Sequence, residues 1–413
     1  MRKIDDTILY LSPYFWPEDI GSAPYCTELA CFLSSRGCRV STVAFRPHYP
    51  NTDSFTEWED GQRDQEYLDG ISIERVAVTA RGSGGFKERL RNDFRYLRYL
   101  LFGAIRGRYT ANSIIAYVPS VLTLYGAKVV KIRSGARIVA VVHDIESGLA
   151  ASLGIAKSRI MIRLMQAVER WGLNFADEVI VLTLGMKEEL EAIGCKRPIT
   201  VLSIWGKVFN DVPIAPEKRP ILMYSGNFGK KQNLDQLLPI LERLACGNLP
   251  VDVVMRGDGS ERDRIEAEMA SRGISNVTFL PLAPSEYFLE SLQSANIHLV
   301  PQALNVANYA LPSKLFSIMS AGRPFVCIAE PDSPLDRIAR ESGAGICAPS
   351  SDSNLAFEMI SDLLADPKRQ REMGLNGRRY IENNMNRDDI LGKYEALALG
   401  GDRTRTAAAD AQR

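Results

Sequence analysis

A Pro-Ser-Lys helix start lies within residues 308–324, whose sequence is NYALPSKLFSIMSAGRP. A helix start directs free backbone N–H groups and a partial positive charge toward whatever precedes it. Ser313 and Lys314 therefore form a candidate anion site, with Leu311 and Pro312 leading into it. The alternative is a capped helix that only packs on a sheet.

Two glycine-containing loops in the same half of the chain have the composition of phosphate-binding loops. Residues 226–232, GNFGKKQ, follow a predicted strand, and their glycines and lysines suit a diphosphate. Gly257, Asp258 and Gly259 follow the next predicted strand. Each motif alone is weak, but three such loops at one sheet edge favour a nucleotide pocket that includes Asn227 and Lys231.

The first half of the chain contains two further candidate sites at strand ends. A predicted strand ends in His143-Asp144-Ile145-Glu146, and active sites of α/β proteins collect at such ends. A structural, hydrogen-bonded histidine is the alternative, and a metal site is disfavoured because no fourth ligand is evident. Gly21 and Ser22 follow the first strand, where a backbone can approach a ligand closely or simply turn.

The elements that must position these residues alternate between strands and helices in both halves of the chain. Such alternation, with strands apolar on both faces, predicts an α/β fold with two doubly wound parallel sheets. The strands predicted are 7–12, 39–45, 71–78, 113–117, 136–142, 178–182, 221–225, 251–255, 276–279 and 297–300. The helices predicted are 24–35, 86–109, 121–132, 158–175, 184–193, 234–244, 260–271, 284–293, 355–364, 368–383 and 390–399.

Length and composition set the number of domains and exclude some partners. A chain of 413 residues fits two domains, and its 50 Lys and Arg balance its 50 Asp and Glu, so nucleic acid is not an expected partner. We expect an N-terminal domain over 1–205, a proline-containing linker over 206–219, a second domain over 220–385, a final helix over 386–399 and a disordered tail over 400–413. No leader or membrane span is expected, which predicts a cytoplasmic protein.

The segment 86–109, FKERLRNDFRYLRYLLFGAIRGRY, is the most basic part of the chain. Its arginines alternate with Phe94, Leu97, Leu101 and Phe102 at helical spacing. A basic helix with aromatic residues can lie on an anionic membrane surface. The other interpretation is a helix that covers a sheet.

Taken together, the motifs resemble the GT-B glycosyltransferases of family 4, and within them the branch that builds colanic acid and other bacterial exopolysaccharides or O-antigens. The matching segments span roughly residues 7–395 and are specific in their combined order. They are YLSPYFWPEDIGSAPYCTELACFLSSRGCRVSTVAF, the H-D-x-E turn, ADEVIVLTLGMKEEL, YSGNFGKKQNLDQLL, RGDGSERDRIE, VTFLPLAPSEYF and LPSKLFSIMSAGRPFV.

The resemblance implies two Rossmann-like domains facing across a cleft, with the acceptor in the first, the nucleotide-sugar in the second and a C-terminal helix that returns to the first. It implies retaining transfer of a sugar from a UDP- or GDP-sugar to a polyprenyl-diphosphate-linked glycan at the inner membrane surface, without a metal or other cofactor. His143 and Asp144 would lie near the transferred sugar, and Lys231 would hold the diphosphate. Gly21 and Ser22 would lie against the donor phosphates or the acceptor. The remaining positions would contact the donor, namely Asn227, Gly257, Asp258, Gly259, Leu311, Pro312, Ser313, Lys314 and Ser317.

One departure from the family pattern concerns two glutamates eight residues apart, which Tyr309 and Ser317 replace in this chain. In the family the second glutamate holds the nucleotide ribose, and a serine offers less reach and no charge. The replacement leaves open a non-catalytic GT-B subunit. A nucleotide-sugar 2-epimerase on the same architecture is a further alternative, although the chain has only three histidines for acid-base chemistry.

Overall fold

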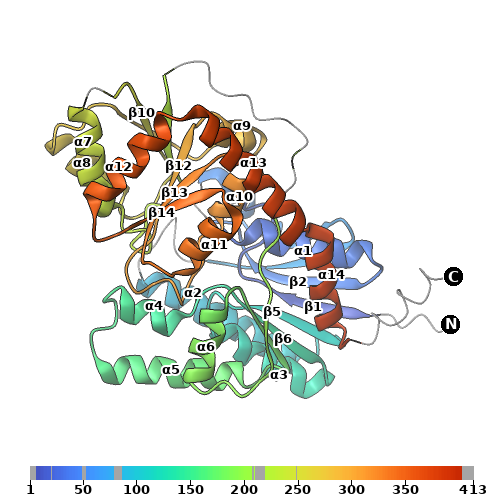
Figure 1. Ribbon diagram of the computed structural model, residues 1–413. Helices are drawn as coiled ribbons and strands as arrows, with labels where there is room; N and C mark the ends of the chain where they lie inside the picture. Colours follow the sequence, from blue (N-terminus) through green and yellow to red (C-terminus); the bar gives the residue numbers. More distant parts are fainter. Residues whose placement is uncertain are drawn as a thin grey trace. The chain divides into compact units, whose positions relative to one another are not determined.

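A computed structural model describes residues 6–19, 21–48, 53–78, 86–206, 209, 219–247 and 249–401, which form two compact units (Figure 1). The first unit comprises Met1–Ser147, Ala156–Ser203 and Asp388–Arg413. The second comprises Gly148–Ile155 and Ile204–Arg387. Most of the predicted linker, and the predicted tail beyond residue 401, lie outside the described residues.

The first unit contains an eight-stranded sheet in the order β3-β4-β2-β1-β5-β6-β7-β8. All neighbouring strands are parallel except β3 and β4, which are antiparallel. The central strands are buried on both faces, as a parallel sheet between two helix layers requires. The strands are β1 (Thr7–Leu11), β2 (Arg39–Phe45), β3 (Gln65–Leu68), β4 (Ile71–Val76), β5 (Ser113–Tyr117), β6 (Arg137–Val142), β7 (Glu178–Val181) and β8 (Ile199–Val201).

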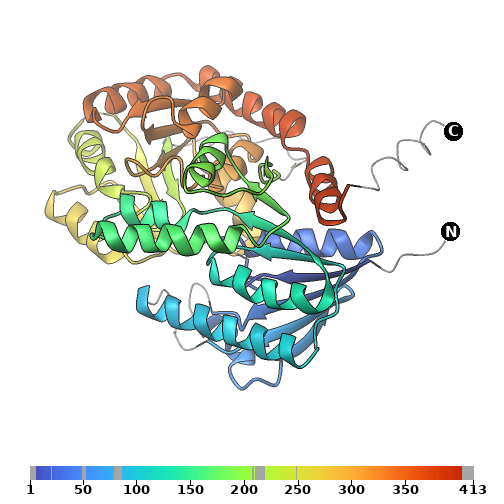
Figure 2. The same ribbon diagram turned by 90° about the horizontal axis from the view of Figure 1, so that it is seen from below.

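Helices cover both faces of this sheet. Helix α14, the last of the chain, lies beside α1, and Arg36 pairs with Glu395 at 3.4 Å. On the other face α3 packs between α2 and α5, as Figure 2 shows. The helices are α1 (Ala23–Ser35), α2 (Phe86–Ile105), α3 (Leu122–Ser134), α5 (Arg159–Leu173), α6 (Leu184–Ala192) and α14 (Arg387–Ala398), while α4 (Glu146–Ser152) begins in the first unit and belongs mostly to the second.

The second unit contains a six-stranded, fully parallel sheet in the order β11-β10-β9-β12-β13-β14. One face packs against α7, α8 and α12 through buried residues such as Leu241, Ile265 and Ile360. The strands are β9 (Ile221–Ser225), β10 (Asp252–Arg256), β11 (Val277–Leu280), β12 (Ile297–Pro301), β13 (Phe325–Ala329) and β14 (Gly345–Pro349). The helices are α7 (Leu238–Cys246), α8 (Arg262–Ser271), α9 (Phe288–Gln293), α10 (Lys314–Ser320), α11 (Pro334–Ser342), α12 (Ser353–Leu364) and α13 (Pro367–Asn384).

Each sheet has one point where the strand order reverses direction. In the first unit β1 lies between β2 and β5, and in the second β9 lies between β10 and β12. Ligands of doubly wound sheets bind outside the carboxyl ends of the strands at such a switch point. The loops that follow β1 and β5, and those that follow β9 and β12, are therefore the positions at which this topology favours a site.

The structure corrects the predicted domain division at residues 148–155, which the sequence placed in the first domain. They belong to the second unit, where Leu149 packs with Val306 and Ala310 in a small apolar cluster. The prediction also lacked β3, β8, β13 and β14, and the helices α4 and α11. Three of these four strands lie at sheet edges, where half-exposed residues weaken the apolar pattern.

Candidate functional site

The predicted Pro-Ser-Lys helix start is present in the second unit and follows the loop after β12. Ser313 is the N-cap of α10, which has seven residues, and the Ser313 side chain makes no capping hydrogen bond. Leu311 and Pro312 are half-buried directly before it. Gly322 ends this segment with a positive φ of 70°, and β13 begins at Phe325.

Lys314 is the most unusual side chain of this segment. Its carbon chain is partly exposed, but its Nζ atom is shielded from solvent and has no hydrogen-bond partner within the described ranges. The Nζ atom lies 3.9 Å from the ring centroid of Tyr224, the fourth residue of β9. Burial lowers the pKa of Lys314 to about 7, while the nearby Cys327 thiol acts in the opposite direction. This amine is therefore only partly charged at neutral pH.

The loop after β9 brings glycine backbone next to this amine. A Cβ atom at Gly226, whose φ is +149°, would lie 3.1 Å from Lys314 Nζ. The position has room for backbone and little more, because any side chain there would meet the lysine. The loop after β9 and the start of α10 thus converge at the switch point of the second sheet.

A second glycine-rich loop, after β10, is hydrogen-bonded to the first. Gly226 N–H donates to Arg256 O at 3.0 Å, and Phe228 N–H donates to Asp258 O at 2.8 Å. A Cβ atom at Gly257, where φ is +138°, would overlap the Gly226 carbonyl. One at Gly259, where φ is +148°, would overlap the Asn227 side chain and the Phe228 carbonyl. Only glycine allows these two loops to approach so closely.

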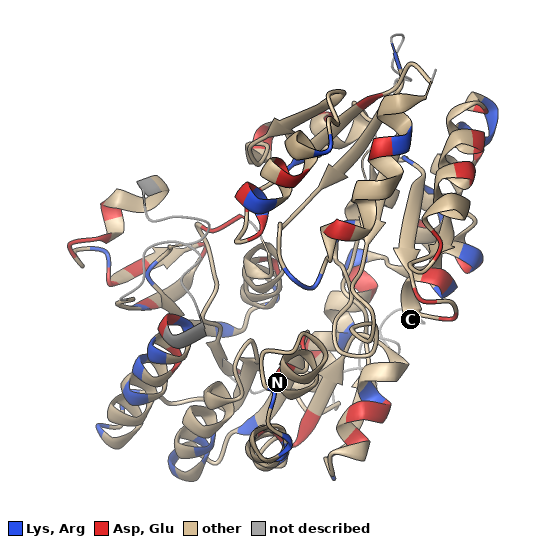
Figure 3. Cartoon of the chain, turned by 90° about the vertical axis from the view of Figure 1, so that its left-hand side faces the viewer, with Lys and Arg blue, Asp and Glu red and all other residues tan. Residues whose placement is uncertain are grey.

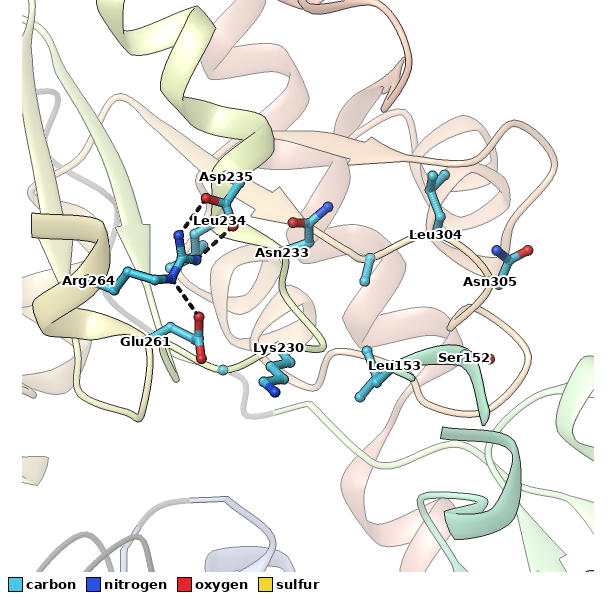
Figure 4. Close-up of a pocket in the computed structure, with 12 residues that line it drawn as sticks. Ser152, Leu153, Lys230, Asn233, Leu234, Asp235, Glu261, Arg264, Leu304 and Asn305 are labelled. Carbon is cyan, nitrogen blue, oxygen red and sulfur yellow. Dashed lines mark hydrogen bonds and ion pairs between the residues drawn. The ribbon is translucent and has the colours of Figure 1, made fainter. Parts of the chain in front are cut away.

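The lysines of the first loop lie in different surroundings. Lys231 is half-buried, and its carbonyl accepts a hydrogen bond from Ala303 N–H at 2.8 Å, which ties the loop to the segment after β12. Lys230 is exposed and lines a cavity of about 330 Å³ (Figure 4). The structure therefore places the Asn227–Lys231 loop, the Gly257–Gly259 loop and Lys314 around one edge of the second sheet.

The cavity contains an ion-pair cluster that the sequence did not indicate. Arg264 pairs with both carboxylate oxygens of Asp235, at 2.8 and 2.7 Å, and with Glu261 at 2.9 Å (Figure 4). The Arg264 hydrogen bonds lower the pKa of Asp235. Arg264 and Asp235 are 29 residues apart in sequence, so no local pattern could have paired them. Ser152 and Leu153, at the end of α4, also line the cavity.

Tyr309 and Ser317, which replace the family glutamates, are placed differently. The Tyr309 ring packs directly on Gly148, where an added Cβ atom would overlap it. Tyr309 N–H also donates to Val306 O at 2.9 Å. Ser317 is half-buried on α10, one turn after Lys314. Tyr309 therefore has a packing role, whereas Ser317 keeps a hydroxyl group on α10 one helical turn after the lysine.

In the first unit, Tyr117 at the end of β5 connects two of the predicted positions. The His143 ring meets the Tyr117 ring edge-on, with centroids 4.9 Å apart. Burial raises the pKa of Tyr117, and the nearby Ser22 hydroxyl opposes this rise. Ser22 is the N-cap of α1, and Gly21 before it has a φ of +65° with open space where a Cβ atom would be. The loop after β1 and the turn after β6 thus meet at one tyrosine that the sequence analysis missed.

His143 and the carboxylates near it have opposite protonation tendencies. Burial lowers the pKa of His143 to about 4, and Asp144 opposes this change, so the imidazole is neutral at pH 7. Burial, together with Asp93 and Glu169, raises the pKa of Glu146 to about 8. Glu146 accepts a hydrogen bond from Val121 N–H at 3.4 Å. His143 can therefore both donate and accept hydrogen bonds, while Glu146 belongs to a buried carboxyl cluster.

No group of three or more His, Cys, Asp or Glu side chains in the described ranges is arranged to hold a metal ion.

Comparisons with known proteins match both halves of the chain. Residues 209–380 match the family described as Glycosyl transferases group 1, and residues 21–205 match the Glycosyl transferase 4-like domain. WcaI of Escherichia coli K12, named as a colanic acid biosynthesis glycosyl transferase, is 25% identical over 413 residues, which cover 94% of this chain and 98% of WcaI.

Solved structures share the fold over nearly the whole chain. Sucrose-phosphate synthase of Thermosynechococcus elongatus has a TM-score of 0.77 at 18% identity, and the match covers 98% of this chain and all of that one. HepE of Anabaena, in complex with UDP-glucose, has a TM-score of 0.67 at 13% identity and covers 95% of this chain and 99% of its own. The two family matches follow one another along the chain, and each covers most of one doubly wound unit. The chain is a GT-B glycosyltransferase of group 1 with a family 4-like first domain.

Proposed function

We propose that this protein is a retaining glycosyltransferase that moves a sugar from a UDP- or GDP-sugar to a lipid-linked oligosaccharide. The observation that carries the proposal is the shielded Nζ atom of Lys314, which has no hydrogen-bond partner in the described structure and adjoins the Gly226 backbone. A buried amine without a hydrogen-bond partner is costly even beside the Tyr224 ring, so its position is best explained by an anionic ligand. The solved structure of HepE with UDP-glucose shows that a protein of this fold binds such a donor.

The chemistry proposed for the second unit is stabilisation of the departing diphosphate. Negative charge develops on the phosphate oxygens as the glycosidic bond to the donor breaks, and fixed cations stabilise it. Lys314 and Lys231 would supply positive charge, and the glycine loops would let backbone N–H groups approach. In the retaining, front-face path the departing phosphate oxygen accepts the proton of the acceptor hydroxyl. The lysines would thereby replace the charge that a metal supplies in other transferases.

The first unit is proposed to bind the acceptor. Its neutral His143 would hydrogen-bond a sugar hydroxyl, and the open space at Gly21 would admit a ligand. Asp144, adjacent to His143, is proposed to orient the same sugar. A lipid-linked acceptor would require this unit to work at a membrane surface. The basic helix α2 is the element that the sequence pattern predicts to contact that surface.

A panel of nucleotide-sugars in a thermal-shift assay tests the donor proposal. At least one UDP- or GDP-sugar is expected to raise the melting temperature, and Lys231→Ala or Lys314→Met should reduce that increase. Lys368→Ala is a matched control, because the Lys368 side chain is 88% exposed and lies on α13. If no donor in the panel shifts the wild-type protein, the proposal is wrong. Product analysis with a polyprenyl-diphosphate glycan then identifies the linkage.

A non-catalytic subunit remains the second candidate because both family glutamates are replaced. Tyr309 packs on Gly148, so this position cannot regain a carboxylate without losing that contact. Ser317 can, and Ser317→Glu separates the two functions. Transfer activity in the wild-type chain supports the enzyme, whereas activity that appears only in Ser317→Glu supports a binding subunit.

A further inference from the structure

Helix α5 carries an apolar stripe on its exposed side. Ile160, Leu164, Ala167 and Trp171 follow one another at spacings of four, three and four residues, which places them on one helix face. Ile160 is 79% exposed, and Leu164 and Trp171 are each 58% exposed. An amphipathic helix normally turns such a stripe toward the core, but here Glu169 and Leu173 are buried instead.

Basic residues accompany the stripe. Arg163 is exposed beside it on α5, and Lys157 and Arg159 are exposed where the helix begins. The single acidic residue of α5, Glu169, is buried and accepts hydrogen bonds from Glu146 N–H and Ser147 Oγ. The exposed part of the helix is therefore apolar and positively charged.

The neighbouring helices of the same layer continue this surface. Helix α3 packs between α5 and α2 and exposes Ile132 and Arg133 near its end. Helix α2 buries Tyr96 and Leu100 against the sheet, as the second interpretation of its sequence predicted, and exposes arginines together with Phe94 and Phe102 on its other side. Figure 2 shows the three helices side by side, and Figure 3 shows Lys and Arg along the helices at its lower left.

The charge of the layer is strongly one-sided. Helices α2, α3 and α5 contain five, three and three basic residues, against two acidic residues in α2 and one in α5; of the basic residues, Lys131 is neutralised by Asp177 at 2.6 Å. Apolar side chains alone would suit a protein partner equally well. Combined with this excess of arginine and lysine, they match a surface that is apolar inside and negatively charged outside.

We propose that α5 docks the first unit on a bilayer of anionic phospholipids. Ile160, Leu164 and Trp171 enter the boundary between headgroups and acyl chains, and the arginines of α5 and α2 contact the phosphates. No helix within the described ranges is long and apolar enough to cross a membrane. The proposal relies on the proposed function only for the location of the acceptor, because docking requires neither donor nor acceptor.

Co-sedimentation of the full chain with vesicles tests this surface. The wild-type protein is expected to bind vesicles that contain phosphatidylglycerol as well as phosphatidylcholine, but not vesicles of phosphatidylcholine alone. High salt should release the bound protein. The triple variant Ile160→Gln, Leu164→Gln, Trp171→Gln should bind at least about a hundredfold more weakly, because each large apolar side chain contributes about tenfold. Arg91→Glu, Arg95→Glu, Arg98→Glu should weaken binding by tens of fold in a salt-dependent manner.

Two matched substitutions in the second unit are the control. Leu355 and Leu375 are exposed apolar residues of α12 and α13, so Leu355→Gln, Leu375→Gln should leave vesicle binding unchanged. Unchanged melting temperatures would show that the α5 variant is folded. Vesicle binding that survives in the folded α5 variant overturns the proposal. So does a wild-type dimer that ignores vesicles and dissociates in the α5 variant, since the stripe would then join two copies.

The fluorescence of Trp171 adds a direct reading of insertion. Trp171 is exposed, Trp16 is half-buried, and Trp58 and Trp205 are buried, so vesicles should shift mainly the Trp171 emission to shorter wavelength. Lipids brominated on the acyl chains should quench it, and Trp171→Phe should bind vesicles without the shift. Absence of the shift in vesicle-bound protein contradicts insertion through α5. Donor binding should be unaffected in every variant, so a failed donor proposal remains distinguishable.

Discussion

The pH dependence of donor binding should reveal the charge state of Lys314. Burial lowers its pKa from 10.5 to about 7 in the unliganded protein, whereas a diphosphate beside the amine would favour its charged form. Below pH 7 the amine is already charged, so the donor affinity should be constant. Above pH 7 binding must take up a proton, and the Kd should rise by up to about tenfold for each pH unit until the pKa of the complex is reached.

The stability of the unliganded protein should change in the same window. Each tenfold change in proton affinity corresponds to about 1.4 kcal/mol, so placing the charged amine in this position costs at most about 5 kcal/mol. Between pH 7 and 10.5 the folded protein binds fewer protons than the unfolded chain, so the free energy of unfolding should increase with pH. Lys314→Met should remove this increase and stabilise the unliganded protein at pH 7 by about 1 to 3 kcal/mol.

Isothermal titration calorimetry between pH 6 and 9, with the nucleotide-sugar that stabilises the protein most, measures the effect. Buffers of different ionisation enthalpy give the number of protons taken up on binding. Lys314→Met should bind weakly and without the pH dependence, while Lys368→Ala should behave as the wild-type protein. A wild-type Kd that is constant from pH 7 to 9, or proton uptake that persists in Lys314→Met, would refute the assignment of this amine to the diphosphate.

Two further substitutions test the loops and the buried carboxyl cluster. Gly257→Ala should destabilise the protein by about 2 kcal/mol or more and abolish donor binding, because its Cβ atom would overlap the Gly226 carbonyl at a φ of +138°. Thermal denaturation measures this, and Gly392→Ala, a helical position with no atoms near the added Cβ, should be neutral or stabilising. Glu146→Gln should stabilise the protein at pH 8 by about 1 to 3 kcal/mol and have little effect at pH 5. The reason is that the pKa of Glu146 is raised from 4.5 to about 8, so the folded protein binds more protons than the unfolded chain in that range and loses stability as pH rises. Urea unfolding at both pH values checks this, and equal effects at pH 5 and 8 would contradict it.

The sequence was sufficient to predict what depends on local patterns. Buried strands such as β5 and β9 have continuous apolar runs, and the loop glycines Gly226 and Gly257 follow strand ends directly, so the fold class and the switch-point loops were predictable. Strand β3 alternates exposed and half-buried residues and β8 has only three residues, whereas β13 (FVCIA) and β14 (GICAP) have successive apolar residues and were missed nonetheless.

Contacts between distant segments were not accessible in the same way. The cluster of Arg264 with Asp235 depends on two different helices, and the meeting of Ser22 and His143 at Tyr117 depends on three loops. The sequence also suggested the start of α10 as an anion site, but not that Lys314 Nζ would be shielded from solvent. That property arises from Tyr224 and Gly226 on another strand and loop.

The return of α14 to the first unit has a consequence for how the protein is made. Ser113 Oγ donates to Ala398 O at 2.8 Å, Arg137 Nε donates to Leu397 O at 3.1 Å, and Tyr394 is buried. Residues that complete the first unit therefore leave the ribosome only after the whole second unit has been synthesised. Until α14 is synthesised, the surface that it covers on the first unit is exposed to water. The second unit can therefore finish folding before the first unit, although most of the first unit is synthesised earlier.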